Sequence, residues 1–132
     1  HPAILTDRGL GPALDDLAGR AMTPVVIETT PSERLPAAIE AGAYFVVAEC
    51  LANVDKYAEA KTATVTVVRL GDALEVEVAD DGRGGADPNA GSGLRGLADR
   101  LGALDGTLRV RSEPGIGTRV QASIPLTPAR SA

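Results

Sequence analysis

Apolar and polar residues recur along the chain with two different periods, which predict helices and strands in turn. Apolar residues spaced three and four apart predict helices over residues 9–21, 35–60 and 94–104. Short apolar runs and apolar–polar alternation predict strands over residues 25–27, 62–70, 73–79, 107–111 and 117–124. Residues 1–7 are expected to be an extended lead-in, because Pro2 disfavours helix in the residue before it.

The order of these elements is helix, strand, helix, hairpin, loop, helix, hairpin. The helices are too few and too clustered for a doubly wound parallel sheet. We therefore expect an α+β fold, a two-layer α/β sandwich. Its sheet is mixed and mostly antiparallel, with about three helices on one face.

The composition is that of an ordinary globular domain, with 44% hydrophobic and 23% charged residues. The formal net charge of −5 argues against a nucleic-acid surface, which needs a basic patch. The single cysteine, Cys50, lies in an apolar helical run and is expected to be a small buried residue. No apolar run is judged long enough to span a membrane, so we expect no direct membrane contact.

The stretch from 79 to 97 combines two acids with two glycine clusters, in the order ADDGRGGADPNAGSGLRGL. Asp80 and Asp81 stand at the exit of a predicted strand, and the second glycine cluster opens the last helix. Such a segment suits a nucleotide. A carboxylate can recognise a base, bare backbone can approach it closely, and a helix N-terminus attracts phosphates.

Two common nucleotide motifs do not explain this stretch. Residues 91–96 match G-x-G-x-x-G, but that fingerprint directly follows a buried strand in a βαβ unit. Here a polar loop, residues 86–90, precedes it, and an antiparallel hairpin follows its helix. A P-loop is also absent from the sequence, since no glycine is followed by Lys-Ser or Lys-Thr.

The long predicted helix carries three polar residues on one flank. Asn53 lies four residues after Glu49, and Lys56 lies three residues further on, so the three occupy neighbouring turns. Because they stand beside an apolar stripe, we expect this helix to form one wall of a pocket.

Four sequence pieces together resemble the nucleotide-binding boxes of the GHKL superfamily, which includes gyrases and histidine kinases. They are Glu49-x-x-x-Asn53 with Lys56-Tyr57, Asp80-x-Gly82-x-Gly84, Gly91-x-Gly93-Leu94, and Gly117-Thr118. The stretch GSGLRGLADRLGALDGTLRVRSEPGIGTRVQASIP looks like bacterial sensor histidine kinases of the nitrate-sensor-like class. The resemblance covers roughly the last three quarters of the chain, one domain-sized unit.

The resemblance implies a Bergerat-type, ATP-binding catalytic domain of a two-component sensor histidine kinase. Such a domain transfers the ATP γ-phosphoryl group to a histidine on a separate helical dimerisation domain and acts upstream of a response regulator. Residues 1–8 would be the linker from that domain, 9–126 the catalytic domain, and 127–132 a flexible tail. A cytoplasmic location is expected. The only histidine, His1, is followed by proline rather than by an acid, so it is not the acceptor.

The resemblance also assigns residues to the purine. Asp80 would accept a hydrogen bond from the adenine amino group, with Thr118 supporting it. Gly82 and Gly84 would let the backbone pass close to the base, and Tyr57 would flank it.

Other residues would serve the phosphates and a magnesium ion. Asn53 would complete the shell of Mg²⁺, and Glu49 would orient a water or that shell. Lys56 would meet the phosphates as a point charge, and Gly91 and Gly93 would present backbone N–H groups to them.

Two acids are expected to stay outside the pocket. Asp55 stands where the resemblance implies a small apolar residue, and at two positions from Asn53 it should face away. Asp81 is expected to be a solvated turn residue.

Two rival functions remain on this sequence. One is a serine kinase of the same fold that phosphorylates an anti-sigma-factor antagonist. The other is a non-catalytic module in which bound ATP only stabilises a protein interface.

Overall fold

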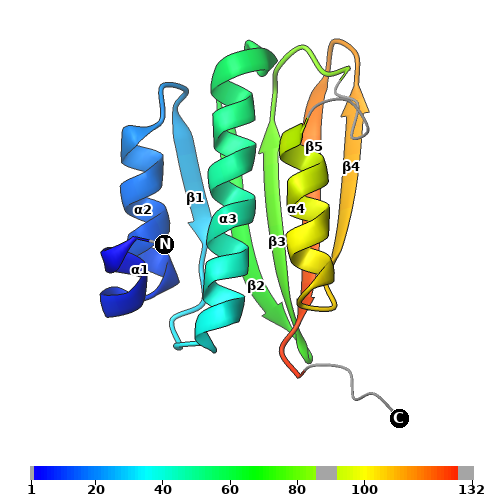
Figure 1. Cartoon of the computed structure of the whole chain (residues 1–132). Helices are drawn as coiled ribbons and strands as arrows, with labels where there is room; N and C mark the ends of the chain where they lie inside the picture. Colours follow the sequence, from blue (N-terminus) through cyan, green and yellow to red (C-terminus); the bar gives the residue numbers. More distant parts are fainter. Residues whose placement is uncertain (1, 86–91, 128–132) are drawn as a thin grey trace.

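The computed structural model describes residues 2–85 and 92–127, and all its helices lie on one face of a single sheet (Figure 1). The elements run in the order α1 (Ala3–Arg8), α2 (Leu10–Arg20), β1 (Val25–Thr29), α3 (Ala37–Asn53), a π-helical segment η1 (Val54–Ala58), β2 (Ala63–Leu70), β3 (Ala73–Asp80), α4 (Ser92–Gly102), β4 (Thr107–Glu113) and β5 (Gly117–Pro125). The predicted two-layer α+β fold is confirmed.

The sheet has five strands in the order β1-β2-β3-β5-β4. Strand β1 pairs with β2 in parallel, because α3 carries the chain back across the sheet between them. The other pairs are antiparallel, so the sheet is mixed and mostly antiparallel, as expected. Strand β5 lies between β3 and β4, so the first residues of β5 lie beside the last residues of β3.

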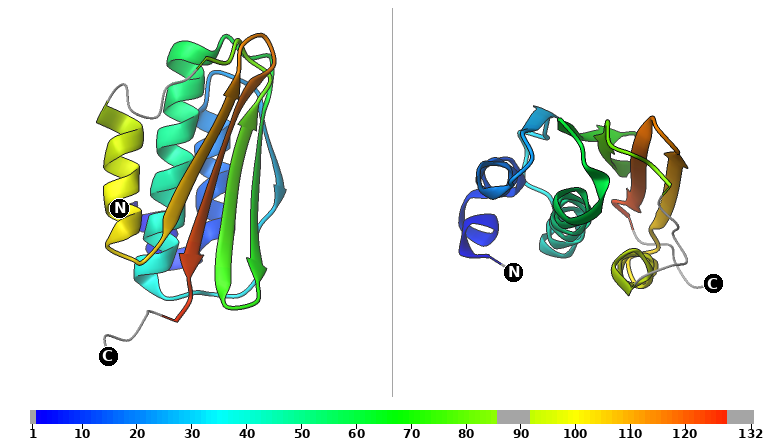
Figure 2. Two further views of the ribbon diagram at one scale, coloured as in Figure 1. Left: turned by 90° about the vertical axis from the view of Figure 1, so that its right-hand side faces the viewer. Right: turned by 90° about the horizontal axis from the view of Figure 1, so that it is seen from above.

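The core lies between the sheet and the helices. Strands β2 and β3 alternate between buried and half-buried residues until their last two positions, and the buried set includes Val65, Val67 and Val76. Helix α3 is apolar around most of its circumference, because it contacts α2, α4 and the sheet together (Figure 2). Cys50 is buried in this core, as expected, and burial raises the pKa of its thiol to about 12.

The N-terminal lead-in is helical, so the expectation of an extended segment is wrong. Helix α1 buries Leu5 against the core and ends at Gly9, whose φ of 88° suits glycine. Pro2 restricts the backbone conformation of the residue before it but not that of the residues after it, and it is the N-cap of this helix.

The stretch Ala37–Tyr57 has the length and composition of a membrane-spanning helix, contrary to the expectation from the sequence. In this fold it is the central core helix, and half of the apolar window is buried inside the domain. Core helices of globular domains pass the same test, so its apolar character follows from packing on three sides.

Candidate functional site

Three polar side chains form a row across the helix-covered face of the sheet, at the end where β3 leaves it. Asp80 on β3 pairs with Thr118 on β5, and Thr118 pairs with Ser112 on β4. The Ser112 and Thr118 hydroxyls are 2.7 Å apart, and Asp80 Oδ1 accepts a hydrogen bond of 2.8 Å from the Gly82 backbone. The row continues the buried positions of these strands beyond the apolar core. It forms a polar floor for a site at this end.

Glycines shape the backbone around this floor. Gly84 has a φ of 69°, and a Cβ atom there would strike the carbonyl oxygen of Glu113. Gly117 has a φ of 141°, and a Cβ atom there would strike the carbonyl oxygen of Asp80. The loop after β3 therefore lies directly against the β4–β5 turn, and Gly84 has a packing role whatever else it contacts.

One wall of the site comes from α3. Glu49 and Asn53 are both half-buried, on consecutive turns. A Cβ atom on Gly93 would strike the Glu49 carboxylate, so that carboxylate lies against the first turn of α4. After burial, the charges of Glu49 and Asp80 also help to raise the pKa of the nearby Cys50 thiol.

The ends of these elements meet at one end of the domain. Figure 1 shows the end of α3, the exit of β3, the start of α4 and the β4–β5 turn together at the top of the view. The contacts link Asp80 with Gly82 and Thr118, Gly84 with the β4–β5 turn, and Glu49 with Gly93, and Asn53 lies one turn after Glu49 on α3.

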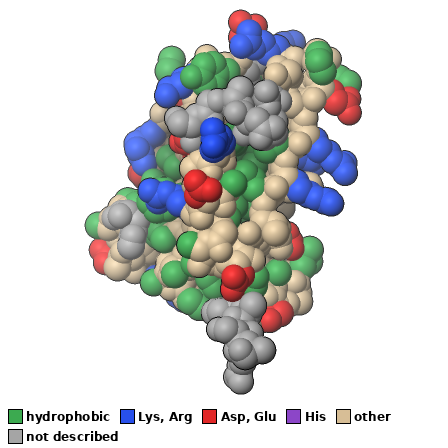
Figure 3. Space-filling view, turned by 45° about the vertical axis from the view of Figure 1, so that its right-hand side comes forward, with side chains coloured by type: hydrophobic (Ala, Val, Ile, Leu, Met, Phe, Trp, Pro, Cys, Tyr) green, Lys and Arg blue, Asp and Glu red, His purple; other side chains and the backbone are tan. Residues whose placement is uncertain are grey.

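Lys56 and Tyr57 lie further out than Glu49 and Asn53. They are on η1, and both are exposed, Tyr57 by 59%. Arg100, on α4, stacks on the Phe45 ring of α3, 4.1 Å from its centroid, so it contributes to packing between the two helices. In the space-filling view, Lys and Arg side chains are spread over this face with acidic ones between them, rather than gathered into one patch (Figure 3).

Gly91 and loop 86–90 lie outside the described residues. Leu94, the first apolar residue of α4, is half-buried against the core and so anchors the start of that helix.

The α3 wall fits a magnesium ion by its donor set. In residues 2–85 and 92–127, neither Glu49 nor Asn53 has a hydrogen bond or ion pair from its side chain, although both are half-buried. No group of three or more His, Cys, Asp or Glu residues converges within those ranges. Mg²⁺ needs only one or two protein oxygens when phosphates and water supply the rest, so this site suits it.

The carboxylates of Asp81 and Asp55 accept hydrogen bonds from backbone N–H groups that are distant in the sequence. Asp81 is exposed, as expected, and its carboxylate also accepts hydrogen bonds from the Lys61 and Thr62 backbone at 2.8 and 3.0 Å. These hydrogen bonds lower the pKa of the Asp81 carboxyl, and the one from the Thr62 backbone has a larger effect than the one from Lys61. Asp55 faces away from Asn53, as expected, toward the loop between α2 and β1.

Sequence reasoning missed Ser112 as part of the polar floor. Its only signal is the alternation of β4, which places it two residues beyond Val110 on the inner face. The strand order, which the sequence does not fix, brings it beside Thr118.

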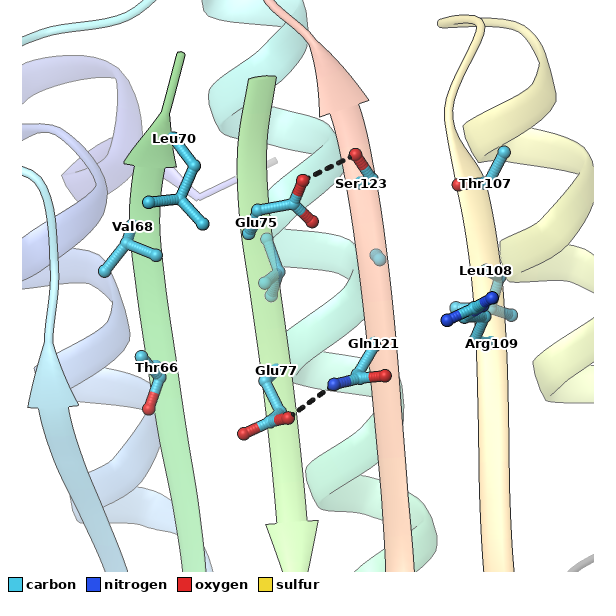
Figure 4. Close-up of a pocket in the computed structure, with 12 residues that line it drawn as sticks. Thr66, Val68, Leu70, Glu75, Glu77, Thr107, Leu108, Arg109, Gln121 and Ser123 are labelled. Atoms are coloured by element: carbon cyan, nitrogen blue, oxygen red, sulfur yellow. Dashed lines mark hydrogen bonds between the residues drawn. The ribbon is translucent and has the colours of Figure 1, made fainter. Parts of the chain in front are cut away.

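A second hollow, of about 840 Å³, lies on the outer face of the sheet (Figure 4). Its carboxylates are already engaged, Glu75 by the Ser123 hydroxyl and Glu77 by the Gln121 amide, each at 2.8 Å. Because these acids are paired, the hollow offers no unpartnered carboxylate to a ligand, and the polar floor remains the better site.

Comparison with known proteins identifies the family of this domain. Residues 38–128 match the family described as histidine kinase-, DNA gyrase B-, and HSP90-like ATPase. The histidine-protein kinase/phosphatase DegS of Brevibacillus brevis is 34% identical over 98 residues, covering 72% of this chain and 25% of that protein. DegS of Bacillus subtilis (strain 168) is 27% identical over 141 residues, covering 96% of this chain and 37% of that protein.

Among solved structures, the blue-light activated histidine kinase of Erythrobacter litoralis EL346 superposes with a TM-score of 0.77. It is 26% identical, and the match covers 89% of this chain and 42% of that one. The histidine kinase AdeS of Acinetobacter baumannii, with a TM-score of 0.62 and 17% identity over 88% of this chain and 60% of that one, shares the fold. The chain thus spans between 25% and 37% of the length of the two DegS proteins.

Proposed function

Since the chain belongs to the histidine kinase-, DNA gyrase B- and HSP90-like ATPase family, we propose that it is the ATP-binding catalytic domain of a two-component sensor histidine kinase. The observation that carries the proposal is the polar floor of Asp80, Thr118 and Ser112 facing the α3 wall of Glu49 and Asn53. A nucleotide bound there has its base over the floor and its phosphates toward the start of α4.

Asp80 selects adenine in this proposal. Its Oδ1 accepts a hydrogen bond from Gly82, which fixes the carboxylate, while the other oxygen remains to accept from the adenine amino group. Guanine carries a carbonyl at the same position, which would repel the carboxylate. Thr118 stands beside Asp80 and keeps the floor polar.

The phosphates meet the first turn of α4. The backbone N–H groups at a helix N-terminus have no partner inside the helix and attract anions. Lys56 adds a point charge from η1. Magnesium held by the Asn53 amide oxygen would neutralise phosphate charge, and the Glu49 carboxylate would order water at that shell.

The transfer itself is mostly positioning and charge stabilisation. The acceptor is a histidine on a separate helical dimerisation domain, joined through the segment ahead of α2, and a response regulator receives the phosphoryl group next. The site residues hold ATP so that its γ-phosphate points out of the domain toward that histidine. We propose a cytoplasmic location, where ATP is supplied.

Transfer to a supplied acceptor tests this function. The chain would be mixed with radiolabelled ATP, magnesium and the helical dimerisation domain of the same protein. Label on a histidine of the acceptor, lost with the Asn53→Ala variant, is the expected result. Label on serine would favour the serine kinase, and ATP binding without any transfer would favour a non-catalytic module.

A further inference from the structure

The segment that carries Lys56 and Tyr57 is a π-helix rather than a continuation of α3. Segment η1 covers Val54–Ala58 and directly follows α3, ending at Glu59 with a φ of 52°. A π-turn holds one more residue than an α-turn. One extra residue rotates every later side chain by about 100° around the helix axis. The π-turn therefore decides which way Lys56 and Tyr57 point.

The carboxylate of Asp55 ties this segment to another part of the fold. Its Oδ2 accepts a hydrogen bond of 3.0 Å from the Met22 backbone, and its Oδ1 accepts one of 2.9 Å from the Thr23 backbone. Both donors belong to the loop between α2 and β1, more than thirty residues away. Both carboxylate oxygens are thus engaged at once.

The pKa of Asp55 is consistent with a charged carboxylate in these two hydrogen bonds. Burial alone would raise the Asp55 pKa, but the hydrogen bonds from Met22 and Thr23 outweigh it and lower that pKa. Asp55 is therefore ionised at neutral pH, and an ionised acceptor makes the stronger hydrogen bond.

We propose that Asp55 is a positioning residue for the nucleotide site. By anchoring the π-turn to the Met22–Thr23 loop, it fixes the direction in which Lys56 and Tyr57 meet the nucleotide. The inference rests on the proposed function, since it requires that ATP binds beside η1. It assigns a binding role to an acid that itself points away from the pocket.

The test combines ATP affinity with amide hydrogen exchange on the 132-residue chain. The variants are Asp55→Ala, Asp55→Asn, Lys56→Ala and the double variant Asp55→Ala with Lys56→Ala. Asp16→Asn is the matched control, because it removes an acid on α2 that pairs with exposed Arg20. Asp55→Asn keeps one acceptor oxygen and the side-chain volume, so it guards against a variant that fails to fold.

The expected result is that Asp55→Ala weakens Mg-ATP binding about tenfold, with Asp55→Asn in between and Asp16→Asn unchanged. Exchange should rise at Met22, Thr23 and across η1 without nucleotide. Lys56→Ala should cost much less in the Asp55→Ala background than in the wild type, because a misdirected lysine contributes little.

Three results would overturn the inference. Unchanged ATP affinity in Asp55→Ala, with exchange raised at the loop, would leave Asp55 a structural tie only. Full additivity with Lys56→Ala would show that Asp55 does not act through that residue. Unchanged exchange would show that the tie does not hold η1. Failure of the wild type to bind ATP would instead refute the proposed function, and this inference with it.

Discussion

Gly84 and Gly85 have nearly the same backbone conformation, yet only one of them is packed. Their φ angles are 69° and 78°, both in the left-handed region. A Cβ atom on Gly84 would strike the Glu113 carbonyl, whereas one on Gly85 would meet nothing within 4 Å. A comparison of substitutions at these two glycines therefore separates the cost of the left-handed backbone from the cost of a steric clash at the edge of the site.

Gly84→Ala should lower the free energy of unfolding by about 3 kcal/mol, against about 1 kcal/mol for Gly85→Ala. The left-handed conformation costs both alanines roughly 1 kcal/mol, and the clash adds about 2 kcal/mol at position 84 alone. Urea denaturation followed by circular dichroism measures both values. Equal losses would mean that the loop after β3 is not held against the β4–β5 turn.

The contacts that sequence reasoning missed share a physical cause. Asp55 and Asp81 bond to backbone donors about twenty to thirty residues away, and Ser112 joins the floor through strand order. Local spacing carries no information on such partners. Asp80, by contrast, was predictable because its strand and its glycines adjoin it in sequence.

Arg34, in the loop before α3, connects α1 to α3. Glu40 is only 3% exposed, and both its oxygens accept from the Arg34 guanidinium, at 3.1 and 3.2 Å. The same guanidinium donates to the carbonyl oxygen of Thr6 at 3.1 Å, near the end of α1. One arginine thus links the N-terminal helix to the core helix.

Arg34→Ala should destabilise the domain by about 2 kcal/mol, because it removes the charged partner of the buried Glu40 carboxylate and leaves that group a hydrogen bond from the Leu35 backbone. The figure is below the usual range for buried pairs, since the Arg34 side chain is 53% exposed. Arg69→Ala, which removes an exposed pair with Glu33, should cost under about 0.5 kcal/mol. Thermal or urea unfolding of both variants makes the comparison, and equal costs would contradict the role of this pair.

Helices and strands were predictable to different degrees. Alternation located β2 and β3 within a residue at each end, because each has one face on the core. Helix α1 was missed, since a six-residue helix shows too little periodicity and depends on Leu5 and Arg34 for its stability. The π-turn of η1 was missed for a similar reason, because its tie to the Met22–Thr23 loop is tertiary.

Over the entire domain, the class of fold followed from element order, but the arrangement of the strands did not. Two antiparallel hairpins were expected from the order of the elements, and both occur. The insertion of β5 beside β3 depends on which apolar faces pack best under α3 and α4, and it creates the Asp80–Thr118 pair. The site is therefore a product of topology as well as of motif.

Calorimetric titration of the chain with ATP, with and without magnesium, addresses base recognition at the polar floor. GTP is the ligand control, Asp80→Asn is the test variant, and Asp16→Asn is the control for lost charge. We expect preferential binding of ATP over GTP, tighter binding with magnesium, and a loss of affinity of at least about tenfold in Asp80→Asn alone. Equal affinity for ATP and GTP, or an unaffected Asp80→Asn variant, would contradict the assignment of Asp80 to the adenine base.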